Sequence, residues 1–461
     1  MKTRTLYVCQ NCGATSARWV GRCPVCGEWE TFVEEHREEK LPARTSRTSS
    51  APATVVPLRA VTPEAQERIR TGIEEFDRVC GGGMVAGSIL LLAGPPGVGK
   101  STLLLQLCAH LDALRPLYIS GEESPEQIRM RADRLRPSPQ ELLLCCETEL
   151  ERIEQLISAV ESPVVVIDSI QTVAHSELES PPGSVAQVRY AASRLQHLAK
   201  QSGKVLLLIG HITKEGLIAG PKVLEHIVDT VLVLEGESPY GYRILRALKN
   251  RFGATHELGF FEMSSEGLRE VRNPSALFLQ ERELPEPGVA IAAVLEGTRP
   301  LLLEVQALVA PSGYSVPQRT ITGYDYRRVQ MLLALLERRF GIGLRHHDVF
   351  VNVVGGLHIY DPALDLAVAL ALVSSYRDLP LPQGTAAFGE IGLTGELRPV
   401  PLPELRLREA QRAGIRQVLL PSALVRNRRR LTWDGLQLLP AERLSTALLQ
   451  LFPSADPSHS R

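Results

Sequence analysis

The segment GPPGVGKS, Gly94 to Ser101, constrains the fold of this chain more than any other stretch. It fits the pattern G-x-x-x-x-G-K-[ST] and stands between an apolar run typical of a strand, SILLLA, and a helical run, STLLLQLCAHL. Strand, glycine-rich turn and helix in this order form a phosphate-binding loop, where backbone N–H groups and the amino end of the helix face phosphate oxygens. The sequence therefore predicts an ATP site at the end of a buried strand.

Each residue of this loop has an expected role. Lys100 should reach the β- and γ-phosphates, and the hydroxyl of Ser101 should ligate Mg²⁺. The other residues that we expect to bind ATP are Gly94, Pro95, Pro96, Gly97, Val98, Gly99 and Thr102.

Uniformly apolar runs alternate with helical stretches from about residue 61 to residue 272. Such runs, for example PVVVIDSI and KVLLLIG, are typical of strands that are buried on both faces, as in a parallel sheet covered by helices. From about residue 273, shorter strands mix with helices, which suggests a separate α+β domain. We therefore predict an α/β fold with a second, α+β domain.

Polar residues end several of the predicted strands. Asp168 follows VVVI, and we expect it to hold Mg²⁺. Glu122 and Glu123 end LYISGEES, and we favour Glu122 as the base that polarises water, although a solvated pair at a helix start capped by Ser124 is the alternative. His211 ends LLLIGH and could sense the γ-phosphate, or be structural.

Four cysteines form the pattern C-x2-C, ten residues, C-x2-C near the amino end. This spacing favours a tetrahedral four-sulfur zinc site over a redox pair or disulfides. A shell closed by four thiolates leaves no open coordination position, so we expect the zinc to be structural. The predicted ligands are Cys9, Cys12, Cys23 and Cys26.

Composition shifts divide the chain into four predicted segments. They are residues 1–35 with the cysteines, a flexible Ser/Thr/Pro-rich linker at 36–60, the nucleotide-binding domain at 61–272, and the α+β domain at 273–455. No apolar run reaches the roughly 18 residues of a membrane span, and the amino end has no apolar signal core. We therefore expect a cytoplasmic protein.

Several stretches together resemble the bacterial RadA/Sms family, DNA repair ATPases of the RecA/DnaB superfamily. They include CQNCG, TGIEEFDRVCGGG, YISGEES, IDSIQTV, GHITKEGLIAGPK and LKNRFGATHELGFFEM, and the resemblance covers nearly the whole chain. It implies a RecA-like core in a homo-hexameric ring, a DNA-dependent ATPase that binds single-stranded DNA and promotes branch migration with RecA. The alternative is a RecA-like ATP-binding regulatory switch without motor activity.

The KNRFG segment carries Lys249 and Arg251, with no acidic residue beside them in the sequence. They are similar in placement to the basic pair of that superfamily that acts on the nucleotide of the next subunit, which is arginine-finger chemistry. The alternative is a contact to DNA phosphate or an exposed strand end. We expect both residues to be catalytic.

Two loops of this superfamily line the central pore, and here they correspond to about 174–190 and 213–222. The net charge of −1 neither requires nor excludes a nucleic-acid partner, so local cations must bind DNA. We expect DNA contacts from Lys214, Lys222 and, third, Arg189, although ordinary solvated loops are the alternative.

The segment from about 273 resembles the proteolytic domain of Lon through GGLHIYDPALDLAVALAL and FGEIGLTGELRPV. Ala363 stands at the position of the nucleophilic serine, and PLPELRLREA stands where the lysine should be. Lys249 is the last lysine of the chain, and arginine cannot serve as a general base. We therefore expect no protease activity, with an ATP-dependent protease as the alternative. Arg327, Arg328 and Arg345 could face duplex DNA, and solvated surface charge is the favoured alternative for any one of them.

Overall fold

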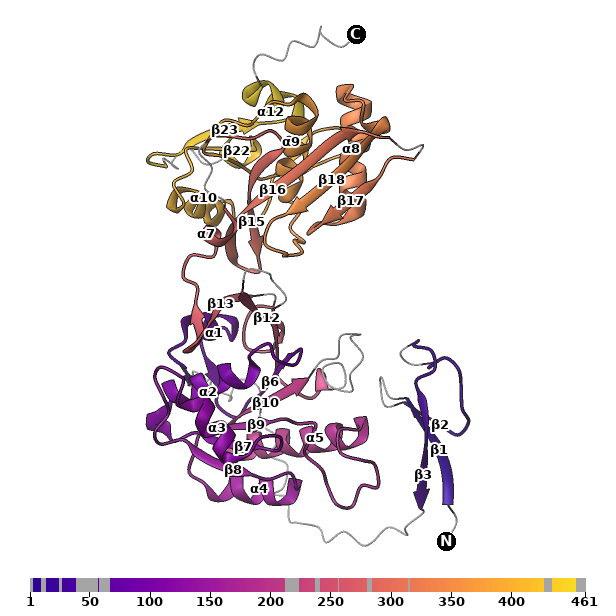
Figure 1. The fold of residues 1–461 in the computed structure, drawn as a ribbon, viewed down its shortest axis with the longest axis vertical. Helices are drawn as coiled ribbons and strands as arrows, with labels where there is room; N and C mark the ends of the chain where they lie inside the picture. Colours follow the sequence, from indigo (N-terminus) through magenta and orange to yellow (C-terminus); the bar gives the residue numbers. More distant parts are fainter. Residues whose placement is uncertain are drawn as a thin grey trace. The chain divides into compact units, whose positions relative to one another are not determined.

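The computed structural model describes residues 3–9, 14–24, 27–38, 57, 67–211, 224–236, 241–255, 257–279, 284–313, 316–426 and 433–452. Contacts divide the chain into two compact units, Met1–Glu270 and Val271–Arg461. Figure 1 labels many of their helices and strands. Within the described residues, no helix combines the length and the apolar character that crossing a membrane requires.

Cys9 ends the central strand of a small antiparallel sheet of order β2-β1-β3 near the amino end. Its strands are β1 (Thr3–Cys9), β2 (Thr15–Ser16) and β3 (Phe32–Glu38). Cys9, Cys23 and Phe32 form its buried core. So small a core needs additional stabilisation, which a bound metal can supply.

The rest of the first unit is built on a nine-stranded sheet of order β14-β13-β12-β11-β6-β10-β9-β7-β8. Six strands from β11 to β8 run parallel, and β12, β13 and β14 extend the sheet as antiparallel strands. The strands are β6 (Ile89–Gly94), β7 (Leu117–Ser120), β8 (Leu143–Cys146), β9 (Val164–Asp168), β10 (Val205–His211), β11 (Thr230–Glu235), β12 (Tyr242–Asn250), β13 (Leu258–Ser264) and β14 (Gly267–Glu270). The α/β fold predicted from the apolar runs is confirmed.

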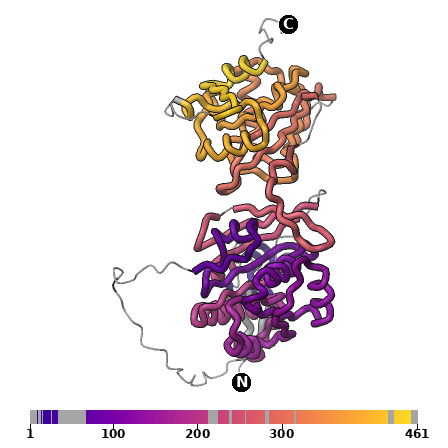
Figure 2. The backbone as a smooth tube through the Cα atoms, turned by 90° about the vertical axis from the view of Figure 1, so that its left-hand side faces the viewer, coloured from indigo at the N-terminus to yellow at the C-terminus, as the bar shows by residue number. Residues whose placement is uncertain are grey.

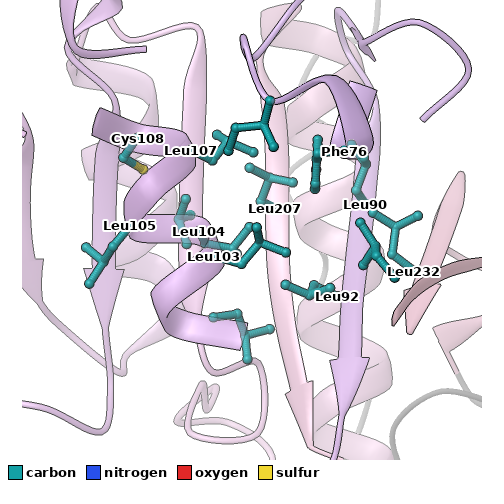
Figure 3. Close-up of a cluster of buried hydrophobic side chains, with 14 of the residues drawn as sticks. Phe76, Leu90, Leu92, Leu103, Leu104, Leu105, Leu107, Cys108, Leu207 and Leu232 are labelled. Atoms are coloured by element: carbon teal, nitrogen blue, oxygen red, sulfur yellow. The ribbon is translucent and has the colours of Figure 1, made fainter. Parts of the chain in front are cut away.

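Helices cover both faces of this sheet, because alternate residues of each strand point to opposite sides. Leu90 and Leu92 of β6 pack with Leu103 and Leu107 on one face, as Figure 3 shows. Ile89 and Leu91 belong to the cluster on the other face. Complete burial of one such side chain stabilises the fold by about 1.5–3 kcal/mol. The helices are α1 (Glu74–Val79), α2 (Lys100–His110), α3 (Pro125–Ala132), α4 (Leu150–Ala159) and α5 (Val185–Ser202), and the short elements are β4 (Arg68–Ile69), β5 (Met84–Val85) and η2 (Asp112–Leu114).

The second unit, orange to yellow in Figure 2, has a seven-stranded sheet of order β17-β18-β16-β15-β19-β22-β23. Its long helix α9 (Leu364–Arg377) is buried along nearly its whole length. Its other elements are α7 (Ser275–Phe278), β15 (Val289–Glu296), β16 (Arg299–Pro311), β17 (Arg319–Thr322), α8 (Tyr326–Phe340), η3 (Leu344–His346), β18 (His347–Val353), β19 (Thr385–Ala387), β20 (Glu390–Ile391), β21 (Leu397–Arg398), α10 (Pro403–Arg412), β22 (Gln417–Pro421), α11 (Ala423–Arg426), β23 (Gln437–Ala441) and α12 (Leu444–Leu451).

Candidate nucleotide site

The phosphate-binding loop begins where β6 ends and closes into α2. A Cβ on Gly94 would lie 2.5 Å from Leu234 O, so only glycine lets the loop pack against the end of β11. Gly97 and Gly99 have φ angles of +76° and +111°, a region that favours glycine. A Cβ on Gly97 would meet no atom of the described residues within 4 Å, so this side of the loop is open toward them. The loop therefore has the shape and the free space that a phosphate group needs.

Lys100 is the first residue of α2, and its side chain folds back over the loop. Its Nζ donates to Gly94 O at 2.9 Å and to Pro95 O at 3.0 Å. Burial lowers the pKa of Lys100, while the nearby carboxylates of Asp168 and Glu122 oppose that shift. The ammonium group thus lies against carbonyl oxygens that phosphate oxygens can replace. Ser101 and Thr102 follow in the first turn of α2 and are half-buried.

The remaining predicted residues meet the loop because parallel strands end at the same edge of the sheet. His211 pairs in register with Gly94, and Asp168 pairs with Ser120, which is two residues before Glu122. Ligand atoms of Glu122, Asp168 and His211 all lie within 4.8 Å of one another. Carboxylate oxygens are the ligands that Mg²⁺ prefers, so this edge of the sheet offers suitable donors.

Asp168 is held in place by a tyrosine from the neighbouring strand. Tyr118 OH donates to Asp168 Oδ2 at 2.5 Å, and both residues are buried. Burial, followed by the charge of Asp168, raises the pKa of Tyr118 well above its ordinary value. The phenol therefore stays protonated and fixes one carboxylate oxygen of Asp168, which leaves the other for a ligand.

The structure separates the two glutamates after β7. Glu122 accepts a hydrogen bond from Ser169 Oγ, and its Oε1 lies 3.2 Å from His211 Nε2. Glu123 instead forms an ion pair with Arg131 of α3. Ser124 caps α3 as expected, in a capping box with Gln127. Glu122 thus faces the candidate site, and Glu123 faces the helix.

Three residues of this edge were not predicted from the sequence: Tyr118, Ser169 and Gln171. Both amide atoms of Gln171 are buried without a hydrogen-bond partner among the described residues, and Nε2 would lie 3.7 Å from a Cβ on Gly210. Ser169 and Gln171 follow Asp168 within IDSIQT, so their position after a strand end was a usable signal. No sequence signal marked Tyr118, because a tyrosine within an apolar strand is typical of a hydrophobic core.

Comparisons with known proteins agree with this geometry. A family model described as an AAA domain matches residues 56–216, one described as a rubredoxin metal binding domain matches residues 7–34, and one described as subunit ChlI of Mg-chelatase matches residues 324–423. The DNA repair protein RadA of Halalkalibacterium halodurans is 47% identical over 424 residues, which are 91% of this chain and 93% of that protein.

The proteins of the same name from Bacillus subtilis and Escherichia coli are 46% and 44% identical, over 92% and 96% of this chain and 93% and 97% of their own lengths. The chain belongs to the RadA family of DNA repair proteins. The family resemblance inferred from the sequence motifs is thereby confirmed. In this RadA-family chain, the AAA-type ATPase domain includes the phosphate-binding loop and its neighbouring carboxylates, and the metal-binding ribbon includes the four cysteines.

Lys249 and Arg251 of this RadA-family chain lie toward the amino ends of the parallel strands, away from the phosphate-binding loop at the carboxyl ends. In the register of the sheet, Lys249 pairs with Val231 of β11, and Val231 pairs with Leu91 of β6. Lys249 Nζ donates to Glu225 O at 2.5 Å and to Val228 O at 2.8 Å. Burial, with the charge of Arg251 second, lowers the pKa of Lys249.

Arg251 has an acidic partner that the sequence did not reveal. Its Nη1 lies 3.0 Å from Oδ1 of the buried Asp229, which is twenty-two residues earlier. Asp229 N donates to Ile89 O, so Arg251 is level with the first residue of β6. Gly94 is five residues after Ile89 in β6, a span of about 16 Å. Neither cation reaches the phosphate-binding loop of its own chain.

The predicted DNA contacts are only partly placed. Lys214 and Lys222 lie outside the described residues. Arg189 is exposed, but it stands on α5 and not in a loop, because the helix begins at Val185 with Ser184 as its cap. The expected loop of 174–190 is therefore shorter. Gln187 anchors it by accepting from His175 N and donating to three backbone carbonyls, those of His175, Leu178 and Ser180.

The ribbon places two of the four predicted zinc ligands. Cys9 and Cys23 are buried beside each other in its core, and Cys12 and Cys26 lie outside the described residues. Gly27 has a φ of +76°, and its N–H donates to Cys23 O at 2.9 Å, which closes a tight turn from Cys23 to Gly27. The buried thiols and this turn fit a four-thiolate metal site.

In the second unit, Asp361 contacts both Ala363, at the expected serine position, and Arg406 of α10. Neither residue has the hydroxyl or amine group that a Ser-Lys protease uses. Asp361 Oδ1 accepts from Ala363 N at 3.0 Å, and its Oδ2 accepts from Arg406 Nη1 at 2.6 Å. Arg406 lies in α10, within the segment where the sequence predicts a lysine to be missing, and it is fully buried. Arg328, one of the three arginines that could face DNA, forms an ion pair with the buried Asp365.

Proposed function

We propose that this protein is a DNA-dependent ATPase that binds single-stranded DNA and drives branch migration of recombination intermediates together with RecA. It works as a homo-hexamer in the cytoplasm, with ATP at the interface between two copies. The observation that carries this proposal is the position of Lys249 and Arg251, at the sheet edge opposite the phosphate-binding loop. Cations placed there do not reach the nucleotide of their own copy, and this supports a role at the nucleotide of the adjacent one.

Each copy supplies two parts of the reaction centre. The loop residues Gly94–Thr102 hold the triphosphate, and Lys100 exchanges its carbonyl acceptors for phosphate oxygens. Ser101 and Asp168 hold Mg²⁺, which when bound neutralises phosphate charge. Glu122, aligned by Ser169, orients the attacking water. Arg251 and Lys249 of the adjacent copy stabilise the charge that develops on the transferred phosphoryl group.

His211 connects the nucleotide to DNA in this proposal. Its Nε2 contacts Glu122, and residue 212 begins the segment that carries Lys214 and Lys222. A change at the γ-phosphate that moves Glu122 therefore acts on His211 directly. Arg189 on α5 adds a third cation for the DNA backbone, and contacts of this kind weaken as salt concentration rises.

The four segments have separate roles. We propose a ribbon at 1–35 held by zinc on Cys9, Cys12, Cys23 and Cys26, a linker at 36–60, the ATPase at 61–272 and a Lon-like scaffold at 273–455. The scaffold does not cleave proteins, because Ala363 has no nucleophile and Arg406 cannot lose a proton. Purified protein should leave casein intact in the presence of ATP and Mg²⁺.

One experiment tests the function: ATPase rate with and without single-stranded DNA, on protein whose mass is measured with ATP bound. We expect a hexamer whose turnover rises on adding DNA. A rate that DNA does not change would favour a regulatory switch over a motor. A fully active monomer would contradict the shared site.

A further inference from the structure

Strand β12 carries cations at both of its ends. Lys249 stands near its end, and Arg243 is its second residue. Because β12 runs antiparallel to β11, Arg243 lies beside the end of β11, where Glu235 pairs with Ile244. This is the edge of the sheet where β6 delivers the phosphate-binding loop. Arg243 therefore belongs to the nucleotide edge of its own chain, unlike Lys249.

Arg243 contacts the phosphate-binding loop directly. Its Nε donates to Val98 O at 3.1 Å, and its Nη1 donates to Tyr242 O at 3.0 Å. A Cβ on Gly236 would lie 2.2 Å from Arg243 Cδ and 3.0 Å from Val98 Cγ2. Because Gly236 has no side chain, the side chain of Arg243 can pass next to it and reach the loop.

The charge of Arg243 is not neutralised within the part of the chain that the structure describes. No carboxylate there forms an ion pair with it, whereas Arg246 on the same strand pairs with Glu235 at 3.7 Å. The guanidinium is half-buried, and only two of its five N–H groups are used in the contacts above. A half-buried cation with free donors beside a phosphate-binding loop is suited to an anionic ligand.

We propose that Arg243 is a nucleotide-binding residue that acts within its own subunit: it fixes the Val98 peptide and supplies positive charge for the nucleoside triphosphate. The inference rests on the proposed ATP-binding function and adds a residue to that site. It assigns opposite roles to the two ends of β12. Arg243 contributes to nucleotide affinity, and Lys249 contributes to turnover on the adjacent copy.

The test is equilibrium binding of a fluorescent ATP analogue and the matching ADP analogue to the full chain with Mg²⁺ and without DNA. Arg243→Gln keeps an N–H donor for Val98 O but removes the charge, and we expect it to weaken binding about tenfold, since a charge-assisted hydrogen bond is lost. Arg243→Lys keeps the charge and should recover most of that affinity. At saturating ATP, the kcat of Arg243→Gln should remain within about twofold of wild type, with the loss in KM.

Two further variants complete the test. Arg246→Gln, three residues along the strand, is the matched control and should bind like wild type. Gly236→Ala should weaken binding as Arg243→Gln does, because the new methyl group displaces Arg243 from the loop, and it serves if Arg243→Gln does not fold. Wild-type affinity in both Arg243→Gln and Gly236→Ala, or a loss confined to kcat, would overturn the inference. Wild-type protein that binds neither analogue would overturn the proposed function as well.

Discussion

Arg251 Nη1 lies 3.0 Å from Asp229 Oδ1, at the amino edge of the parallel strands, while Lys100 lies at their carboxyl edge. Asp229 is almost fully buried, and its Oδ2 accepts from Ile89 N at 3.1 Å. The carboxylate therefore orients Arg251 from within its own chain, while about half of the arginine side chain stays exposed. Such a preorganised cation loses little side-chain freedom when an interface forms.

Replacing Glu122 should stop hydrolysis without preventing ATP binding. Glu122→Gln cannot polarise water as a carboxylate does, and general-base catalysis contributes about 10²–10⁴-fold to a rate. Steady-state turnover measured beside nucleotide affinity separates the two effects. Glu123→Gln is the matched control, because Glu123 pairs with Arg131, and its turnover should fall far less. Equal losses in the two variants would contradict the assignment.

The buried pair of Arg406 and Asp361 should be important for the stability of the second unit. Arg406→Ala leaves the carboxylate of Asp361 buried without its cation, which typically costs about 3–5 kcal/mol. Urea unfolding followed by the fluorescence of Trp433, with Trp19 and Trp29 replaced by Phe, measures this. Arg408→Ala, exposed on the same helix, should change stability by no more than about 0.5 kcal/mol. A similar small change for Arg406→Ala would show that the pair is not stabilising.

Glu396 predicts a pH effect of defined sign. A hydrogen bond from the Thr394 hydroxyl, followed by backbone and Arg398 contacts, lowers the pKa of Glu396 to about 2. A carboxylate with a lowered folded-state pKa stabilises the fold above its ordinary pKa of 4.5 and loses that contribution as pH falls toward 2. The stability difference between wild type and Glu396→Gln should therefore be larger at pH 6 than at pH 3. A difference independent of pH would contradict this.

Zinc should be bound by the ribbon alone. Cys9→Ser removes one of the four predicted ligands, and we expect the zinc content to fall from one ion per chain to nearly none. Elemental analysis of purified protein measures this directly. Cys146→Ser is the control, since Cys146 is exposed on β8 and should leave the metal in place. Full zinc content in Cys9→Ser would exclude the four-cysteine site.

The strands, the loop and the family could be predicted because their signals are local. Strand-end residues such as Asp168 and His211 could be placed together because parallel strands share an edge. Ion-pair partners that are distant in sequence could not be predicted, because no local pattern marks Asp229 as the partner of Arg251 or Asp365 as the partner of Arg328. Arg243 was missed because one arginine within a strand resembles a solvated residue. Its contact with Val98 depends on the close passage over Gly236.

A shared site predicts that two inactive variants restore each other. Lys100→Ala lacks the phosphate-binding lysine but keeps Arg251, whereas Arg251→Ala keeps the lysine and lacks the arginine. Removing such a cation is expected to lower kcat by about 10³-fold or more. ATPase activity of each variant, and of an equal mixture reassembled before ATP is added, is the most direct measurement. We predict recovery to about a quarter of the wild-type rate, because about one interface in four of a randomly mixed ring combines both intact parts. A mixture no faster than the mean of its two components would contradict a site completed by the adjacent copy.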